Sequence, residues 1–181
     1  MANVRLRSLE MSDLDNIMRW VNDPEVVGNF ANFKIPISRE EEKKFLEKTL
    51  ASETDRVFAI ENEQGDYVGN VGIHQIHWPS RVGRLGLIIG AKENWNKGYA
   101  ETAVNEVLGL AFNHYNLHKV WGMVWEDNPK TRHLYIDKCS FKVEGILQDE
   151  YFHQGKYHNI IRIAMLEDDY RALVKSREET K

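Results

Sequence analysis

The sequence predicts an α/β or α+β fold in which helices flank one central sheet. Strand-like and helical segments alternate along the chain, and neither an internal repeat nor a Pro/Gly/Ser-rich linker divides it. Its 181 residues, 42% hydrophobic and 29% charged, are ordinary for one globular unit, so we expect a single domain over residues 1–181. A chain of this length buries roughly two-thirds of its unfolded surface and needs no disulfide or metal to fold.

The first part of the chain reads as a short strand and two capped helices. Ser12, with Asp15 three residues later, predicts a capping box, and Ser38 with Glu41 predicts another. The expected elements are a strand at 4–6, a helix at 13–21 ended by Asn22-Asp23-Pro24, a loop at 28–37, and a helix at 39–51 with the apolar stripe Phe45, Leu46 and Leu50.

The remainder alternates strands with three more helices. We expect strands at 57–60, 67–76, 83–89, 120–125, 141–145, 148–152 and 160–166, helices at 98–113, 128–139 and 168–175, and turns at 63–66, 78–80 and 154–155. Gly72 and Gly86 lie inside two of these strands, which favours a bulge or the close approach of another group to the backbone.

Composition excludes several classes of function. Net charge is −4, with 28 acidic and 24 basic residues, so no basic surface for nucleic acid is expected. No apolar run approaches the roughly 18 residues of a membrane span, and residues 1–5 alternate polar and apolar, unlike a signal peptide. The single cysteine, Cys139, forms no internal disulfide, and no Cys/His cluster has metal-binding spacing. We therefore expect a cytoplasmic protein without a metal.

Two segments are candidates for chemistry. Residues 87–100 form a buried strand, a turn and a helix that opens near Gly98, which suits either a phosphate at the helix N-terminus or a simple tight connection. Neither GxxxxGK(S/T) nor GxGxxG is present. In the second segment, Asn128 caps a helix and Tyr135 lies seven residues further on, either facing the helix start or packed in the core.

Together these segments resemble the GNAT superfamily of acetyl-CoA-dependent N-acetyltransferases. Its acyl-CoA motif is Gln or Arg, two variable residues, Gly, one variable residue, then Gly or Ala. Residues 95–100, WNKGYA, match it with Trp95 in first position, as in the branch of Rim-type ribosomal-protein and spermidine N-acetyltransferases. Residues 134–145 resemble the family's LYEKxGFxxEG run, with Ser140 in place of the usual Gly. The likeness covers about 57–166, and more loosely the opening at 20–24.

The resemblance implies a mixed, mostly antiparallel sheet of about seven strands with one splayed pair that admits acyl-CoA. By this likeness, main-chain groups of Leu87, Ile88 and Ile89 bind the pantetheine arm, amides of Asn96, Lys97, Gly98, Tyr99 and Ala100 hold the pyrophosphate, and Asn128 contacts the arm. The chemistry is direct attack of a primary amine on the acetyl-CoA thioester in a ternary complex.

The resemblance assigns Tyr135 as the acid that protonates the departing thiolate. Arg84 stands where many members carry a Glu base, and an Arg cannot be a base. Glu126, Asp127 and His74 are the remaining candidates, with ordered water as the alternative. We predict Tyr135 and Glu126 as catalytic residues, and Arg84 and His74 as substrate-binding residues.

The acceptor is less determined. The acidic run at 40–42 precedes Lys43-Lys44 and is typical of a solvated helix face, and residues 30–36 lack the acidic-aromatic signature expected of spermidine acetyltransferases. Arg84 suits an anionic acceptor such as an amino sugar on a nucleotide. We expect a small-molecule amine, either an amino sugar or a polyamine. The alternatives are a protein N-terminus and a domain that binds acyl-CoA without catalysis. A homodimer or higher homo-oligomer is compatible with the sequence.

Overall fold

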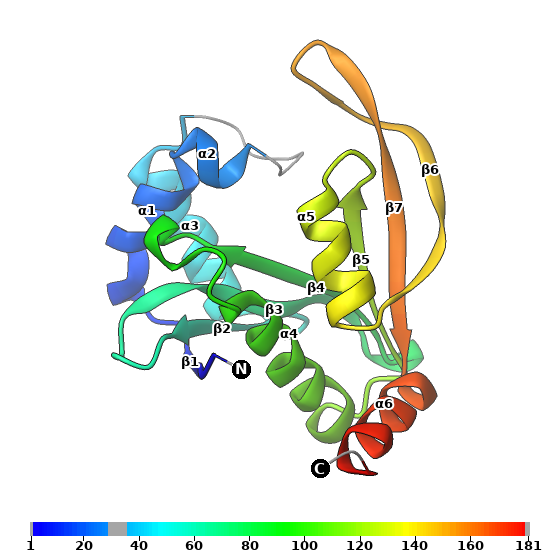
Figure 1. The fold of residues 1–181 in the computed structure, drawn as a ribbon. Helices are drawn as coiled ribbons and strands as arrows, with labels where there is room; N and C mark the ends of the chain where they lie inside the picture. The colour runs from blue at the N-terminus through cyan, green and yellow to red at the C-terminus, as the bar shows by residue number, and fades with distance from the viewer. Residues whose placement is uncertain (1, 29–35, 180–181) are drawn as a thin grey trace.

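The computed structural model describes residues 2–28 and 36–179, and a seven-stranded sheet runs through this part of the chain (Figure 1). The strands lie in the order β1-β2-β3-β4-β5-β7-β6. Their bounds are Arg5–Ser8 (β1), Arg56–Glu61 (β2), Tyr67–His77 (β3), Val82–Ile89 (β4), Lys119–Trp125 (β5), Lys142–His153 (β6) and Lys156–Leu166 (β7). The sequence pattern separates 141–145 from 148–152, but both segments fall largely in β6, which continues through two register shifts.

All neighbouring strands of this sheet are antiparallel except β4 and β5. These two run parallel and pair only as far as Arg84 and Trp121. Beyond that point β4 stays with β3 up to Ile89, and β5 stays with β7 up to Trp125. The strands therefore separate over their C-terminal halves, as Figure 1 shows. The predicted mixed, mostly antiparallel sheet with one splayed pair is confirmed.

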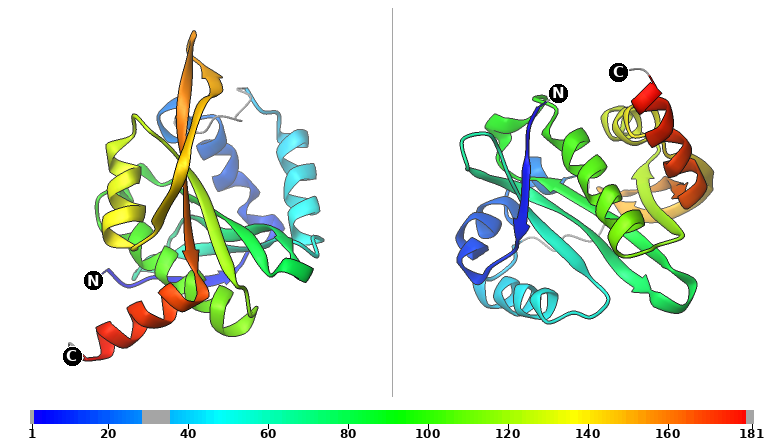
Figure 2. Two further views of the ribbon diagram at one scale, coloured as in Figure 1. Left: turned by 90° about the vertical axis from the view of Figure 1, so that its right-hand side faces the viewer. Right: turned by 90° about the horizontal axis from the view of Figure 1, so that it is seen from below.

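Helices cover both faces of the sheet (Figure 2). Their bounds are Leu14–Val21 (α1), Pro24–Val27 (α2), Arg39–Leu50 (α3), Tyr99–Gly109 (α4), Pro129–Arg132 (α5) and Glu167–Glu179 (α6), with wider π-helical turns at Leu110–His114 and His133–Lys138. Buried residues of α1, α2 and α3 pack together on one face, here called the α3 face. Those of α4 and of the turn after α5 pack on the other, the α4 face.

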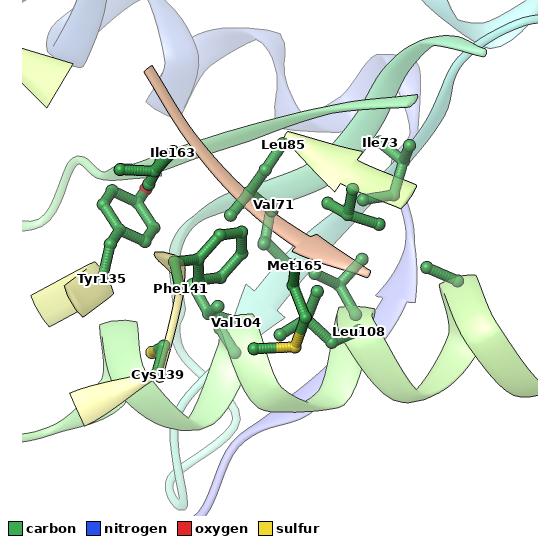
Figure 3. Packing of buried hydrophobic residues seen from close by; sticks show 14 of the residues in the cluster. Val71, Ile73, Leu85, Val104, Leu108, Tyr135, Cys139, Phe141, Ile163 and Met165 are labelled. Carbon is green, nitrogen blue, oxygen red and sulfur yellow. The ribbon is translucent and has the colours of Figure 1, made fainter. Parts of the chain in front are cut away.

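The larger core lies on the α4 face (Figure 3). Val104 and Leu108 of α4 meet Val71, Ile73 and Ile163 of the sheet, and each is less than 2% exposed. Full burial of one such side chain contributes roughly 1.5–3 kcal/mol, so this contact stabilises the packing of α4 against the sheet. Ala103, Val107 and Ala111 are also buried here, and Leu110 is half-buried.

The helix starts only partly follow the sequence prediction. The box of Ser38 and Glu41 is confirmed at the start of α3. Ser12 caps nothing: Glu10 and Asp13 form the capping box, and a short 3-10 turn at Met11–Asp13 precedes α1. Asp23 caps α2, a four-residue helix that is too short to show periodicity.

The predicted α3 stripe is wrong in two of its three residues. Leu46 is buried, whereas Phe45 and Leu50 are 60% and 43% exposed. Glu42 lies one turn before Leu46 and is the other buried residue of the helix. The face of α3 that meets the sheet therefore includes a carboxyl group that an apolar pattern overlooks.

Gly72 and Gly86 pair with each other across β3 and β4. A Cβ on Gly72 would lie 2.6 Å from the Arg56 carbonyl oxygen, and one on Gly86 would lie 2.7 Å from His74 Nε2. The expected close approach is confirmed, and the register shifts in β3 lie elsewhere, at Ile60/Glu61 and between His74 and His77.

Candidate active site

Main-chain groups of β4 open into the gap between β4 and β5. The Gly90 N–H donates to the Val68 carbonyl at 2.9 Å. Because hydrogen-bonding direction alternates along an antiparallel strand, Ile88 turns its N–H and C=O toward β3, and Leu87 and Ile89 turn theirs toward the gap. An extended ligand can pair with Leu87 as an added strand would. Of the three residues predicted to bind the extended arm through their main chain, Ile88 is the exception, because neither its N–H nor its C=O faces the gap.

The turn after β4 brings a helix N-terminus to the wide end of this gap. The Trp95 indole Nε1 donates to the Ile89 carbonyl at 2.7 Å, which ties the turn to the strand. Asn96 and Gly98 adopt left-handed conformations, with φ of 60° and 89°. The helix begins at Tyr99, and no side chain caps it. Its first N–H groups are therefore available to an anion.

The five residues predicted to hold a pyrophosphate thus form one turn and the start of α4. Lys97 Nζ lies 3.5 Å from Asn94 Oδ1. The Tyr99 hydroxyl donates to Glu63 at 2.5 Å, so its ring anchors the helix start to the β2–β3 turn. Ala100 is the second helical residue. Their backbone amides belong to the helix start or to the turn directly before it, where the helix dipole favours negative charge.

Asn128 follows β5 at the wide end and caps α5, as predicted. Its Oδ1 accepts the Thr131 N–H at 3.1 Å, and Pro129 occupies the first helical position. The cap fixes the direction of α5, which carries the chain back along the α4 face toward Tyr135.

Tyr135 lies within the π-helical turn after α5. The Cys139 N–H donates to the Leu134 carbonyl, five residues back, and such wide turns are frequent at functional sites. The Tyr135 ring is 9% exposed and packs edge-on against Phe141, with centroids 5.7 Å apart. Within the described part of the chain its hydroxyl forms no hydrogen bond. Burial raises the pKa of Tyr135, so the phenol keeps its proton at neutral pH.

The Tyr135 hydroxyl is directed toward the narrow end of the gap, which is the end where β4 and β5 still pair. Figure 3 shows it turned toward Ile163. Ile163 pairs with Gly122, and Gly122 directly follows Trp121, the last residue of β5 that pairs with β4. A proton donor therefore lies on the α4 face beside the point where the two strands part.

Glu126 and Asp127 lie at the wide end, where β5 has ended. The Glu126 carboxylate accepts from Asn159 Nδ2 at 2.8 Å. Asp127 contacts His158 at 3.0 Å and Lys156 at 3.5 Å. Burial raises the pKa of Asp127, but His158 and Lys156 hold it below its usual value. Both carboxylates are already engaged by polar side chains.

His74 and Arg84 face each other across β3 and β4 at the narrow end. His74 Nδ1 lies 3.1 Å from Asp55 Oδ1. Burial lowers the pKa of His74, the charge of Arg84 lowers it further, and Asp55 opposes both. The imidazole is therefore neutral at pH 7. The two predicted substrate-binding residues come together, on the face opposite Tyr135.

A second arginine extends this cationic site. The Arg162 guanidinium lies over the Trp121 ring, 3.4 Å from its centroid, and Trp121 pairs with Arg84. Arg162 Nε is 3.6 Å from Glu144, which also pairs with Lys119. The Nε atoms of both arginines are buried without a hydrogen bond in the described structure. An anionic group is the ligand that such guanidinium groups prefer.

Sequence reasoning overlooked Asp55 and Arg162. Asp55 follows a helix in a polar loop, and only strand pairing brings it to His74. Arg162 interrupts the apolar run of β7, and this is the one signal that would have singled it out. The acidic-aromatic signature looked for at 30–36 falls on 30–35, which lie outside the described residues.

Within residues 2–28 and 36–179, no group of three or more His, Cys, Asp or Glu side chains is arranged to hold a metal ion. None of the helices in these ranges is long and apolar enough to cross a membrane.

Comparison with known proteins identifies the relatives of this arrangement. Residues 3–140 match the family model described as acetyltransferase (GNAT) domain. The chain is 32% identical over 170 residues to a spermidine N(1)-acetyltransferase of Vibrio cholerae, which covers 93% of this chain and 96% of that protein.

Two solved structures give the same result. A crystal structure of spermidine N-acetyltransferase from Vibrio cholerae in complex with CoA and spermine superposes with a TM-score of 0.86 at 32% identity, covering 93% of this chain and 98% of that one. A dodecameric structure of spermidine N-acetyltransferase from Vibrio cholerae, in an intermediate state, superposes with a TM-score of 0.77 at 30% identity, covering 92% and 95%.

Proposed function

Because this chain belongs to the GNAT acetyltransferase family, we propose that it transfers the acetyl group of acetyl-CoA to a primary amine of a small molecule, with polyamines as the first acceptor class. One observation carries the proposal: β4 and β5 part beyond Arg84 and Trp121, and an uncapped helix N-terminus lies at the wide end. This geometry suits a ligand with an extended arm and a pyrophosphate.

In the proposed complex, the pyrophosphate of acetyl-CoA lies at the wide end of the gap between β4 and β5. The amides of Asn96, Lys97, Gly98, Tyr99 and Ala100 hold the pyrophosphate, the main chain of Leu87 and Ile89 pairs with the pantetheine arm, and Asn128 contacts the arm from α5. Because the arm runs along β4 away from the helix start, the thioester reaches the narrow end.

The amine nitrogen attacks the thioester carbonyl, and the C–S bond breaks as the tetrahedral intermediate collapses. Tyr135 then donates its proton to the thiolate, and its buried, protonated state supports this role. A primary amine has a pKa of about 10.4 and must first lose a proton. This deprotonation falls to one of the candidate bases Glu126, Asp127 and His74.

The acceptor class rests on two opposing observations. The relatives named above are spermidine acetyltransferases, which favours a polyamine. The guanidinium groups of Arg84 and Arg162 on the α3 face favour instead an amine that also carries an anionic group, such as an amino sugar on a nucleotide. The second class therefore remains a candidate beside the first.

A thiol-release assay with acetyl-CoA separates the acceptors. The panel contains spermidine, spermine, a nucleotide-linked amino sugar and a peptide with a free N-terminus. We expect release with a small amine and none with the peptide. Arg84→Gln should lower the KM for spermidine and raise that for the nucleotide-linked amine, because it removes one cation. If none of these amines releases thiol above the hydrolysis background, the proposed function is wrong.

We also propose that the protein acts as a cytoplasmic homo-oligomer. Large apolar side chains are exposed on several elements, among them Phe45 on α3 and Val143, Ile146 and Phe152 on β6. The dodecameric relative supports the assembly of copies through such surfaces. Light scattering at micromolar concentration tests this, and a monomeric mass would contradict it.

A further inference from the structure

The His74 ring is held by a carboxylate on one side and lies over a glycine on the other. Asp55 Oδ1 lies 3.1 Å from His74 Nδ1 and also accepts the Gln75 N–H at 3.0 Å, while its Oδ2 accepts the Ser52 hydroxyl at 2.6 Å. The Cβ position of Gly86 is 2.7 Å from Nε2, so this edge of the ring covers the main chain of β4. With the Nδ1 proton held by Asp55, Nε2 carries the lone pair.

This ring lies at the narrow end of the gap. Gly86 is two residues beyond Arg84, the last residue of β4 that pairs with β5, a distance of about 7 Å along a strand. Tyr135 reaches the same end from the α4 face, beside Ile163, whereas His74 lies on the α3 face. An acid and a lone-pair donor therefore flank the parting strands from opposite faces.

We propose that His74 is the general base of the acetyl transfer and that Asp55 is its positioning residue, an assignment that rests on the proposed function. Nε2 takes a proton from the acceptor ammonium and becomes imidazolium. The freed amine forms the C–N bond, the C–S bond breaks, and the thiolate takes the Tyr135 proton. Solvent then takes the proton from His74 and the second proton from the amide nitrogen, and it returns one proton to Tyr135.

The electrostatic surroundings suit a base that works at neutral pH. Burial lowers the pKa of His74, and the 23% of its side chain that stays exposed lets an acceptor reach it. The charged groups that act on it are Asp55, from the loop before β2, and Arg84, from β4. Asp55 stabilises the imidazolium once it forms, and burial, with a smaller contribution from the charge of Arg84, keeps the resting ring neutral.

Glu126 and Asp127 are less suited to this step. Glu126 is five residues beyond Trp121, about 16 Å along a strand, and so belongs to the wide end. Its carboxylate accepts from Asn159, and Asp127 is paired with His158. Each lies nearer the expected pyrophosphate than the expected thioester.

The pH profile of kcat tests the assignment. In the wild type, with both substrates saturating, kcat should change little between about pH 7 and 9, because the base is already neutral. In His74→Gln, kcat at pH 7 should fall by ~10²–10³-fold and rise about tenfold per pH unit, because reaction then depends on free amine. Asp55→Asn should lower kcat at least about tenfold and leave the KM for acetyl-CoA unchanged.

His77→Gln provides the matched control. His77 lies on the same strand and is exposed, and its ring nitrogen Nδ1 contacts the Ser80 hydroxyl at 2.9 Å, so kcat and the pH profile of this variant should equal those of the wild type. Melting temperature and calorimetric acetyl-CoA affinity confirm that each variant folds and binds the donor.

Three outcomes overturn the proposal. A His74→Gln enzyme with kcat within about threefold of wild type and an unchanged profile removes the role of His74. A tenfold-per-unit profile that appears in Glu126→Gln instead assigns the proton to Glu126. If the wild type acetylates no amine of the panel, the proposed function fails and the base assignment fails with it. If the wild type does acetylate an amine and the pH profile of His74→Gln equals that of the wild type, the base assignment alone is rejected.

Discussion

Replacing Tyr135 by phenylalanine removes one hydroxyl group and leaves the packing of the ring intact. The ring is 9% exposed and contacts Phe141 edge-on, and phenylalanine keeps this contact. Because the described structure gives the hydroxyl no hydrogen bond, its loss should change the free energy of unfolding by less than ~0.5 kcal/mol. The melting temperature should then stay within about 2 °C of wild type.

The rate should respond differently. A positioned acid contributes ~10²–10⁴-fold, so kcat of Tyr135→Phe should fall within that range. At about 1.36 kcal/mol per tenfold, this corresponds to about 3–5 kcal/mol of transition-state stabilisation. Acetyl-CoA affinity should change by less than about twofold, because a thioether-like sulfur is a weak hydrogen-bond acceptor in the ground state.

Single-turnover rate and melting temperature, measured on one preparation, separate an acid from a core residue. A tyrosine that only packs in the core would leave the turnover of the folded fraction nearly normal, and an unchanged melting temperature excludes a folding defect as the cause of a low rate. If Tyr135→Phe retains more than about half of wild-type turnover, Tyr135 is not the acid and the mechanism proposed above is wrong.

Four further results are expected. Gly98→Glu should weaken acetyl-CoA binding in calorimetry at least about tenfold, because it adds negative charge at the pyrophosphate position. Gly98→Ala shares the backbone strain at φ 89° and should weaken binding less. Equal affinities of Gly98→Glu and wild type would falsify the placement of the pyrophosphate at this turn. The KM for spermidine should change less than about twofold as salt is raised from about 50 to 300 mM, because most of the described carboxylates of α3 and of the loop after it are paired or buried. A steep rise would indicate that exposed acidic groups attract the polyamine. Burial raises the pKa of Glu42 above its ordinary 4.5, so folding stability falls as pH rises through the raised value and the buried carboxyl group becomes charged. Glu42→Gln removes this charge and should increase the melting temperature by ~2–4 °C at pH 7 but not at pH 4. Arg84→Gln should raise the pKa of His74, so the fall of kcat on the acid side of its pH profile should move to higher pH. If the acid side of the profile does not move, it does not arise from protonation of His74.

The fold could be predicted from the sequence wherever one periodicity dominates. Alternation located β2, β3, β4, β5 and β7 to within a few residues, and the Ser38 box located the start of α3. At α1, two overlapping boxes compete: Ser12 with Asp15, and Glu10 with Asp13. The structure selects the second, in which Arg7 also pairs with Asp13 across the turn. That long side chain comes from β1, so a local pattern cannot reveal it.

The α3 stripe failed for a related reason. On a helix, Glu42, Leu46 and Thr49 share a face, since they are separated by four and three residues, and this face is turned to the sheet. Phe45 lies about 100° away around the helix and is exposed. Because the buried face of α3 contains the carboxyl group of Glu42, the apolar pattern did not identify this face. The exposed Phe45 instead suggested a face that points to solvent. The exposure of Phe45 agrees with the homo-oligomer proposed above, in which another copy would cover such a side chain.

The candidate site shows the same division between local and long-range information. The turn at 95–100 and the Asn128 cap depend on consecutive residues, and both formed as expected. The environment of the base depends on the register of three strands and on a loop that is distant in sequence. Asp55 and His74 are 19 residues apart, and no spacing rule connects them.

The arginine that stands in place of the usual glutamate illustrates why this register matters. Arg84 cannot accept a proton, and taken alone it argues against base catalysis. Strand pairing sets it opposite His74, and there its positive charge lowers the pKa of the imidazole. A base must be unprotonated before it acts, so burial of the ring and, to a smaller extent, the charge of Arg84 favour the neutral form that the proposed base needs. Asp55 supplies the opposing charge on the far side of the ring, where it holds Nδ1 and leaves Nε2 directed over Gly86. In the proposed mechanism, a carboxylate that acts through an imidazole takes the place of the usual carboxylate of the strand, and Arg84 stays available to an acceptor that carries an anionic group.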